Sequence, residues 1–181
     1  MNSRRQFFKQ GSFGLLPLVL PVSFFSNFTS GFEGIVVNEN DGETFRLRDG
    51  RAEVKIKISK RQGAASMSVL TSTVPTNDAI RIHKHLNEDE IFFIRQGKGL
   101  FTLGTSEHEV SAGSIIFIPK GIWHGLKNTG SEEIATVFGY SPAGFEDFFK
   151  ELGTAADKPF VEKSTEERKA IAKKWGMVYK D

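Results

Sequence analysis

The region from Phe32 to Tyr140 consists of short segments in which apolar and polar residues alternate, and Gly, Pro, Asn or Asp separate these segments. The segment Ala52–Ser59 shows the pattern most clearly. Because successive side chains of a strand point to opposite faces, this alternation predicts a strand with one buried face and one wet face. Further strands are predicted at Ala65–Val74, Ile80–His85, Glu90–Gln96, Leu100–Leu103, Ser114–Ile118 and Ile134–Tyr140. Many short strands at regular spacing favour an all-β sandwich or barrel.

Two helices are predicted after the strands. The first is expected to begin at Ser141-Pro142, with a cap residue followed by proline at the first helical position, and to end before Gly153. Its apolar face would carry Phe145, Phe148, Phe149 and Leu152.

The second predicted helix begins at Ser164-Thr165-Glu166-Glu167, which fits a capping box, and ends at Gly176. Ile171 and Trp175 would point inward. We expect residues 142–181 to pack on the β-domain, over a sheet or a barrel mouth, rather than to form a domain of their own.

Composition limits the class of protein. The 181 residues suit one globular domain with a proper core. Arg4, Arg5 and Lys9 contribute three positive charges to a formal net charge of +2, so the rest of the chain carries −1. Such a body has no electrostatic footprint for nucleic acid. The chain contains no cysteine, so a metal site must use imidazole and carboxylate ligands.

The first 30 residues are interpreted as an export leader. Arg4 and Arg5 precede an apolar stretch from Gly11 to about Phe25, which is too short to span a membrane. The paired arginines resemble a twin-arginine signal, which predicts a bacterial periplasmic protein. The alternative is an N-terminal tail that is disordered or touches the membrane. No clear small-residue cleavage site follows, so an uncleaved leader would tether the protein to the membrane.

Three of the four histidines have spacings that suit metal binding. His83 and His85 are two apart in a predicted strand, so both imidazoles project to the same face. Glu90 starts the next predicted strand, which is expected to pair antiparallel with the first, and His124 follows an apolar strand and a turn. Each residue alone is more often an ordinary surface or core residue, and only the combination indicates a site. His108 fits the ordinary exposed role.

These residues lie in two motifs that resemble those of the cupin family. The segment His83–Glu90, followed six residues later by Gly97, is similar to the first cupin motif, although Asn77 stands where that motif usually has Gly. The segment Gly113–Asn128 is similar to the second motif. The resemblance implies a double-stranded β-helix barrel over residues 31–141 that holds one divalent metal ion through His83, His85, Glu90 and His124.

The ligand set suits several transition metals. Three imidazoles and a carboxylate accept iron, manganese, nickel, cobalt, copper or zinc, and the ligands alone do not choose among them. Around the ion, Phe92 and Ile94 share the face of Glu90, and the candidate lining of a substrate pocket is Phe92, Ile94, Phe101 and Leu126. These four residues are first of all expected in the barrel core.

The resemblance to quercetin-type cupins implies a metal-dependent dioxygenase that acts on a small aromatic or enolic compound. Glu90 would then be both ligand and catalytic base. Two alternatives are a non-oxidative isomerase or decarboxylase, and a cupin that binds a small ligand without turnover. A homodimer is expected, because apolar strands lie near the ends of the barrel and because cupins commonly pair.

Overall fold

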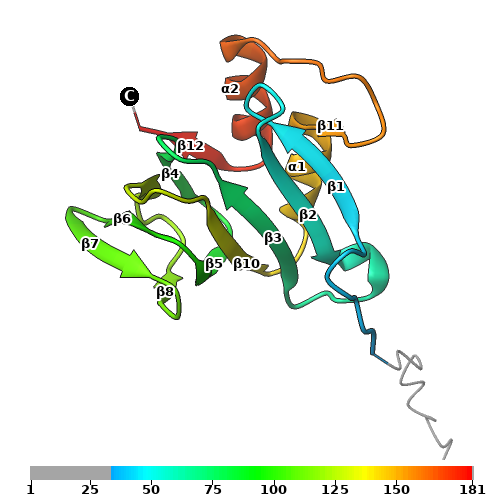
Figure 1. The fold of residues 1–181 in the computed structure, drawn as a ribbon. Helices are drawn as coiled ribbons and strands as arrows, with labels where there is room; N and C mark the ends of the chain where they lie inside the picture. The colour runs from blue at the N-terminus through cyan, green and yellow to red at the C-terminus, as the bar shows by residue number, and fades with distance from the viewer. Residues whose placement is uncertain (1–33, 181) are drawn as a thin grey trace, which may run out of the picture. The chain divides into compact units, whose positions relative to one another are not determined.

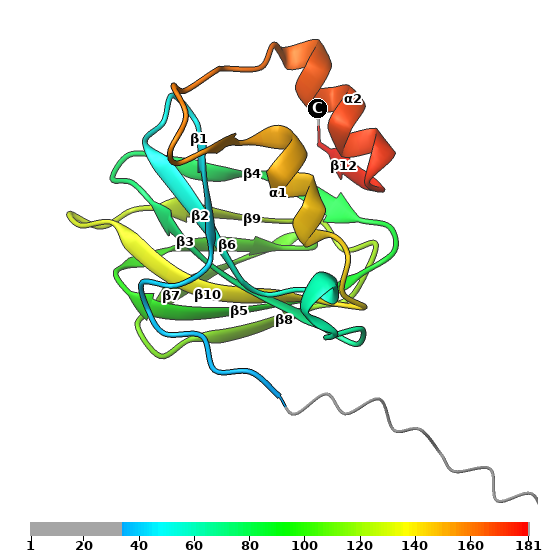
Figure 2. The same ribbon diagram turned by 90° about the vertical axis from the view of Figure 1, so that its right-hand side faces the viewer.

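The computed structural model describes residues 34–180, whose strands form two facing antiparallel sheets (Figures 1 and 2). The first sheet has the order β11 (Thr154–Ala155), β1 (Glu43–Leu47), β2 (Ala52–Ile58), β3 (Ser68–Val74), β10 (Ile134–Ser141), β5 (Asp89–Gln96), β8 (Ile115–Ile118). The second has the order β12 (Met177–Tyr179), β4 (Ala79–His85), β9 (His124–Asn128), β6 (Lys98–Leu103), β7 (Ser106–Ser111). The predicted all-β architecture is confirmed. The export leader proposed for residues 1–30 lies outside the described residues.

Alternation along the strands builds the core between the sheets. In β5, every second side chain is buried, and Phe92 and Ile94 point inward while Ile91 and Phe93 remain exposed. Leu70 of β3 is likewise fully buried. Closing two such faces against each other removes apolar surface from water, which is the main stabilising contribution to the barrel.

The first predicted helix begins later than expected. Helix α1 spans Glu146–Leu152, so Pro142 does not occupy its first position. The reason lies in the contacts of Glu146, whose buried carboxylate accepts hydrogen bonds from the backbone amides of Gly144 and Lys60. Lys60 begins the short 3₁₀ helix η1 (Lys60–Gln62), so the carboxylate ties the start of α1 to a distant loop.

The second helix agrees with its prediction and is followed by an unexpected strand. Helix α2 spans Thr165–Lys174, and Ser164 and Glu167 form the expected capping box. Gly176 then adopts a φ of 70°, a conformation that glycine reaches easily, and the chain returns as β12. Both helices lie at one side of the barrel near β1, β11 and β12 (Figure 2). No helix within residues 34–180 is long and apolar enough to cross a membrane.

Asn77, the departure from the first cupin motif, has a φ of 60°. Asparagine tolerates this left-handed conformation better than other non-glycine residues, so the turn keeps its shape.

Candidate metal centre

Strand β4 presents His83 and His85 on its inner face, as the two-residue spacing predicts. Both side chains are buried. The pairing of β4 with β9 shifts register between Ile80 and His83, which marks a β-bulge just before the first histidine. Bulges re-aim side chains, and here Ile80, Arg81 and His83 all line the same cavity.

Glu90 comes from the opposite sheet, which corrects the predicted pairing of its strand with β4. Strand β5 pairs with β10 and β8, whereas β4 pairs with β9 and β12. The connection between β4 and β5 therefore crosses from one sheet to the other, and Glu90 meets the histidines across the barrel interior. The ligand side chains therefore converge from both walls of the barrel.

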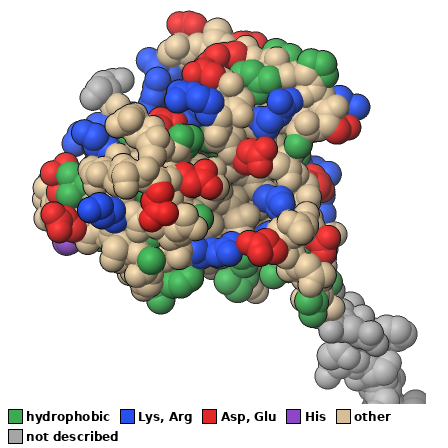
Figure 3. All heavy atoms as spheres, viewed as in Figure 1, with side chains coloured by type: hydrophobic (Ala, Val, Ile, Leu, Met, Phe, Trp, Pro, Cys, Tyr) green, Lys and Arg blue, Asp and Glu red, His purple; other side chains and the backbone are tan. Residues whose placement is uncertain are grey.

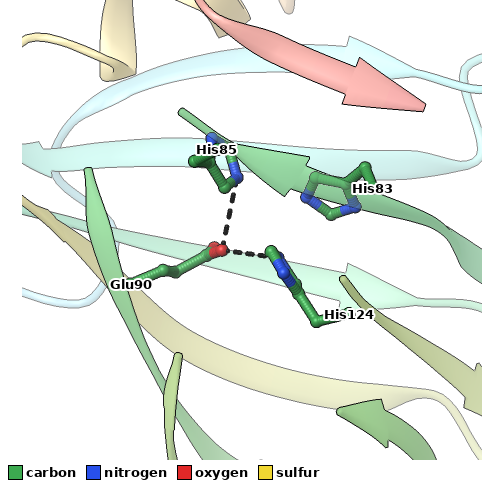
Figure 4. Close-up of side chains that lie close together, drawn as sticks. All are labelled: His83, His85, Glu90 and His124. Atoms are coloured by element: carbon green, nitrogen blue, oxygen red, sulfur yellow. Dashed lines mark ion pairs between the residues drawn. The ribbon is translucent and has the colours of Figure 1, made fainter. Parts of the chain in front are cut away.

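His124 begins β9 and lies directly opposite His83 in the antiparallel pair. The four predicted ligands thus meet at one point, with ligand atoms all within 4.8 Å of one another (Figure 4). The Glu90 Oε2 atom is 2.8 Å from His124 Nε2 and 3.3 Å from His85 Nε2. His108, by contrast, is exposed on β7.

Backbone carbonyls fix the orientation of two imidazoles. His83 Nδ1 lies 2.8 Å from the carbonyl oxygen of Arg81, and His124 Nδ1 lies 2.9 Å from that of Ile122. A carbonyl only accepts hydrogen bonds, so each Nδ1 carries the proton and donates it. The Nε2 lone pair of each ring is then free to bind an ion, which is the arrangement common around metal-bound histidines.

The polar atoms at the centre lack hydrogen-bond partners within the described residues. Four buried atoms have no hydrogen-bond partner there, because their short contacts do not have hydrogen-bond geometry. These atoms are both ring nitrogens of His85, Nε2 of His124 and Oε2 of Glu90. A buried carboxylate and buried imidazoles in this state are costly. A divalent transition metal would satisfy these atoms together, so the residues present fit the ion that the donor set implies.

Burial and mutual charge keep the ligands in the protonation states that metals require. Burial, together with the neighbouring His124 and His85, lowers the pKa of His83 to about 3, so this imidazole is neutral at physiological pH. For Glu90, burial acts to raise the pKa, but the contacts with His124 and His85 outweigh it and the pKa lies below its usual range. Neutral imidazole and ionised carboxylate are the metal-binding forms.

A cavity of about 630 Å³ opens onto His83 and Glu90. Its inner wall includes Phe92, which was predicted for the substrate pocket. The other three predicted lining residues, Ile94, Phe101 and Leu126, are packed in the hydrophobic core and are not among those that line the cavity. They lie deeper in the barrel, where facing strands fill the interior.

Several lining residues were not identified from the sequence. Tyr140 on β10 lies opposite Glu90 on β5, and Phe138 lies two residues before it. Burial, followed by the negative charge of Glu90, raises the pKa of Tyr140 well above its usual range, so its hydroxyl stays protonated. The alternation of β10 places these rings inward, but the pairing partner Glu90 becomes evident only in the structure.

The C-terminal segment supplies much of the remaining wall. Phe145 and Phe148 come from the start of α1 and its surroundings, and Met177 and Tyr179 come from β12. Phe145 also stands against His85, with ring centroids 4.3 Å apart. The segment outside the strand-rich region therefore shapes the cavity beside the ligands.

Comparison with known proteins agrees with this fold. Residues 70–139 match the family model described as a cupin domain. The chain is 33% identical over 81 residues to an uncharacterized protein of Methanocaldococcus jannaschii. The matched stretch covers 44% of this chain and 65% of that protein, so the chain spans less than two thirds of the relative's length. It is 26% identical over 107 residues to the oxalate-binding protein of Thermotoga maritima, with 56% of this chain and 88% of that protein covered.

Two solved structures share the fold. A predicted oxalate decarboxylase from T. maritima has a TM-score of 0.55 at 23% identity, covering 60% of this chain and 99% of that one. KdgF from Halomonas sp. has a TM-score of 0.56 at 16% identity, covering 63% and 98%. The described residues thus form a double-stranded β-helix barrel, of which residues 70–139 match a cupin domain, and His83, His85, Glu90 and His124 form a candidate metal site inside it.

Proposed function

We propose that this protein is a metal-dependent dioxygenase that acts on a small aromatic or enolic compound. One observation carries the proposal: an aromatic-walled cavity reaches the metal-site residues on the side of His83 and Glu90. His85 and His124 are not among the residues that line it. A compound in the cavity thus approaches the ligand cluster from the face where the carboxylate lies.

The walls suit a flat apolar compound. Phe92, Phe138 and Phe145 border the inner cavity, and rings of this kind orient an aromatic substrate by edge and face contacts while they exclude water. A volume of about 630 Å³ is in the range of cavities that bind small molecules.

Glu90 is the base in this proposal. A bound divalent ion would supply Lewis acidity and a binding position for oxygen. Glu90, held ionised, accepts the proton of an enol or phenol at its carboxylate. Tyr140 pairs with Glu90 across the strands, lines the same cavity and stays protonated, so it does not compete with Glu90 for the proton.

A second candidate is a non-oxidative reaction or simple binding of a small acid. The observation that favours it is the 26% identity to the oxalate-binding protein of T. maritima. A decarboxylase or isomerase would use the same cluster without oxygen.

Oxygen uptake tests the proposal. Protein loaded separately with Fe, Mn, Ni, Co, Cu or Zn would be mixed with quercetin and with simple catechols, and oxygen consumption would be compared with substrate loss. The proposal predicts that, with at least one metal, the molar amount of oxygen consumed equals the molar amount of substrate lost. Glu90→Gln protein with the same metal content should lose turnover. Substrate loss without oxygen would favour the non-oxidative reaction, and a ligand that raises the melting temperature but stays unchanged would favour binding alone.

A further inference from the structure

The outer part of the cavity is basic, in contrast to its aromatic interior. Arg and Lys outnumber Asp and Glu among the residues that line it. Figure 3 shows Lys and Arg side chains on this face of the molecule in the part where Figure 1 places α2, β12 and β1, with acidic side chains among them. The net charge of +2 for the whole chain would not reveal this local excess.

Three arginines from separate elements line the cavity together with Tyr179. Arg81 belongs to β4, Arg168 to α2, and Arg48 directly follows β1. Burial raises the pKa of Tyr179, and the positive charges of Arg81, Arg168 and Arg48 oppose that rise. The same three arginines and Tyr179 line the cavity.

The arginines keep donors available for a ligand. Arg48 Nη1 is 3.2 Å from Asp78 Oδ2, and Arg168 binds Glu162 and the carbonyl of Lys163. The side chain of Arg81 makes no hydrogen bond or ion pair with any residue of 34–180. Because a guanidinium has five N–H donors, the group retains an unfilled capacity for an oxyanion.

The arginine cluster lies at a defined separation from the metal-site residues. Arg81 precedes His83 by two residues on β4, a rise of roughly 6–7 Å along a strand. Tyr179 lies opposite His83, with ring centroids 6.5 Å apart. A ligand that spans from the ligand cluster to the arginines must therefore be longer than a two-carbon diacid.

We infer that the substrate is an aromatic or enolic carboxylate whose reacting end enters the His83–Glu90 end of the cavity and whose carboxylate binds Arg81, Arg48 and Arg168 at the mouth. The inference rests on the proposed function only for the reacting end. The planar carboxylate matches the guanidinium fork, and the aromatic side chains that line the same cavity accept the ring. Tyr179 adds a neutral hydroxyl donor beside the same group.

Dihydrocaffeate and its amide provide a matched pair of probes. Both carry a catechol that binds metal, and they differ only in the charge of the remote group. The probes would be titrated by calorimetry into zinc-loaded protein, because zinc does not catalyse oxidation of the catechol. The acid should bind at least about tenfold more tightly than the amide. Part of this preference should persist in metal-free protein, because the arginines do not depend on the ion.

Substitutions should show which arginines cause the preference for the acid over the amide. Arg81→Gln should remove most of it, Arg168→Gln should reduce it, and Arg81→Lys should retain part. Arg95→Gln is the control, since Arg95 forms a similar exposed ion pair with Glu39 and does not line this cavity. Raised salt should weaken binding of the acid more than that of the amide.

Equal affinity for acid and amide would overturn the inference, and so would an equal loss in Arg95→Gln. Tighter binding of the phosphonate analogue than of the acid would overturn the carboxylate class. These results do not depend on oxygen uptake. A protein that prefers the acid but consumes no oxygen would contradict the proposed dioxygenase and leave the arginine subsite standing.

Discussion

Tyr179 lies directly opposite His83 in the antiparallel pair of β12 and β4. The same pairing places Met177 opposite His85, so the C-terminal strand adjoins both histidines of the first motif. Strand β12 lies outside residues 70–139, the part that matches the cupin domain. The metal-site strand therefore depends for its outer support on a segment beyond the family match.

Removing the C-terminal strand should weaken metal binding. Deletion of residues 177–181 would leave β4 as a sheet edge and free its backbone to move, and we expect metal affinity to fall at least about tenfold, as for loss of other groups that orient ligands. Competition with a chromophoric chelator would measure the affinity, and circular dichroism would verify folding. Val178→Ala, which trims a half-exposed outward side chain, is the control. Unchanged affinity in the deletion would show that β12 does not support the site.

Substitution of a metal-site histidine should lower the metal content, whereas substitution of His108 should not. His85→Ala and His124→Ala should lose most bound metal, because each removes one of four converging ligands. His108→Ala should keep it, since this side chain is exposed on β7. Elemental analysis of the purified variants measures the effect. Equal metal content in all three would rule out the assignment.

Glu146 should contribute strongly to the free energy of unfolding. Its carboxylate is buried and accepts backbone hydrogen bonds of 2.8 and 2.6 Å. Glu146→Ala leaves the amides of Lys60 and Gly144 without this acceptor, and we expect a loss of about 3 kcal/mol in the free energy of unfolding. Ser164→Ala, which removes only the cap of α2, should cost about 1 kcal/mol. Urea denaturation compares the two, and similar losses would mean that the buried carboxylate is no more important than an exposed cap.

The homodimer predicted from the sequence has a candidate surface on β5 and β8. Ile91 and Phe93 are exposed opposite Phe117 and Ile115, and Ile115 and Phe117 have exposed fractions of 68% and 59%. Figure 3 shows hydrophobic side chains along the lower edge of the view. If two copies cover this surface, light scattering should give twice the subunit mass, and Phe117→Lys should give a monomer.

Val36→Lys, at a more exposed apolar residue elsewhere, is the control for this surface and should remain dimeric. A wild-type mass of one subunit across a wide concentration range would remove the dimer altogether.

The leader remains a proposal with its own test. Replacing Arg4 and Arg5 by Lys should retain the protein in the cytoplasm if a twin-arginine pathway exports it folded. Fractionation followed by immunoblotting locates the protein, and elemental analysis shows which metal it holds. Unchanged export would exclude the pathway.

The sequence alone predicted seven of the strands and the four candidate ligands, but it did not indicate β1, β7, β11 or β12. Alternation is a local property, so the segments around Ala52–Ile58 and Ile134–Ser141 follow directly from their own residues. The spacing of His83 and His85 likewise fixes a shared face before any tertiary contact is considered.

Tertiary structure decided which strands pair and what surrounds the ligands. Glu90 was expected beside β4 but reaches the histidines from the other sheet. Pairing between distant strands depends on the packing of whole faces, which local periodicity does not encode. For the same reason, neither the placement of Tyr140 beside Glu90 nor the gathering of Arg48, Arg81 and Arg168 along one cavity could be read from sequence spacing. These residues meet because the two sheets and the C-terminal segment enclose one cavity.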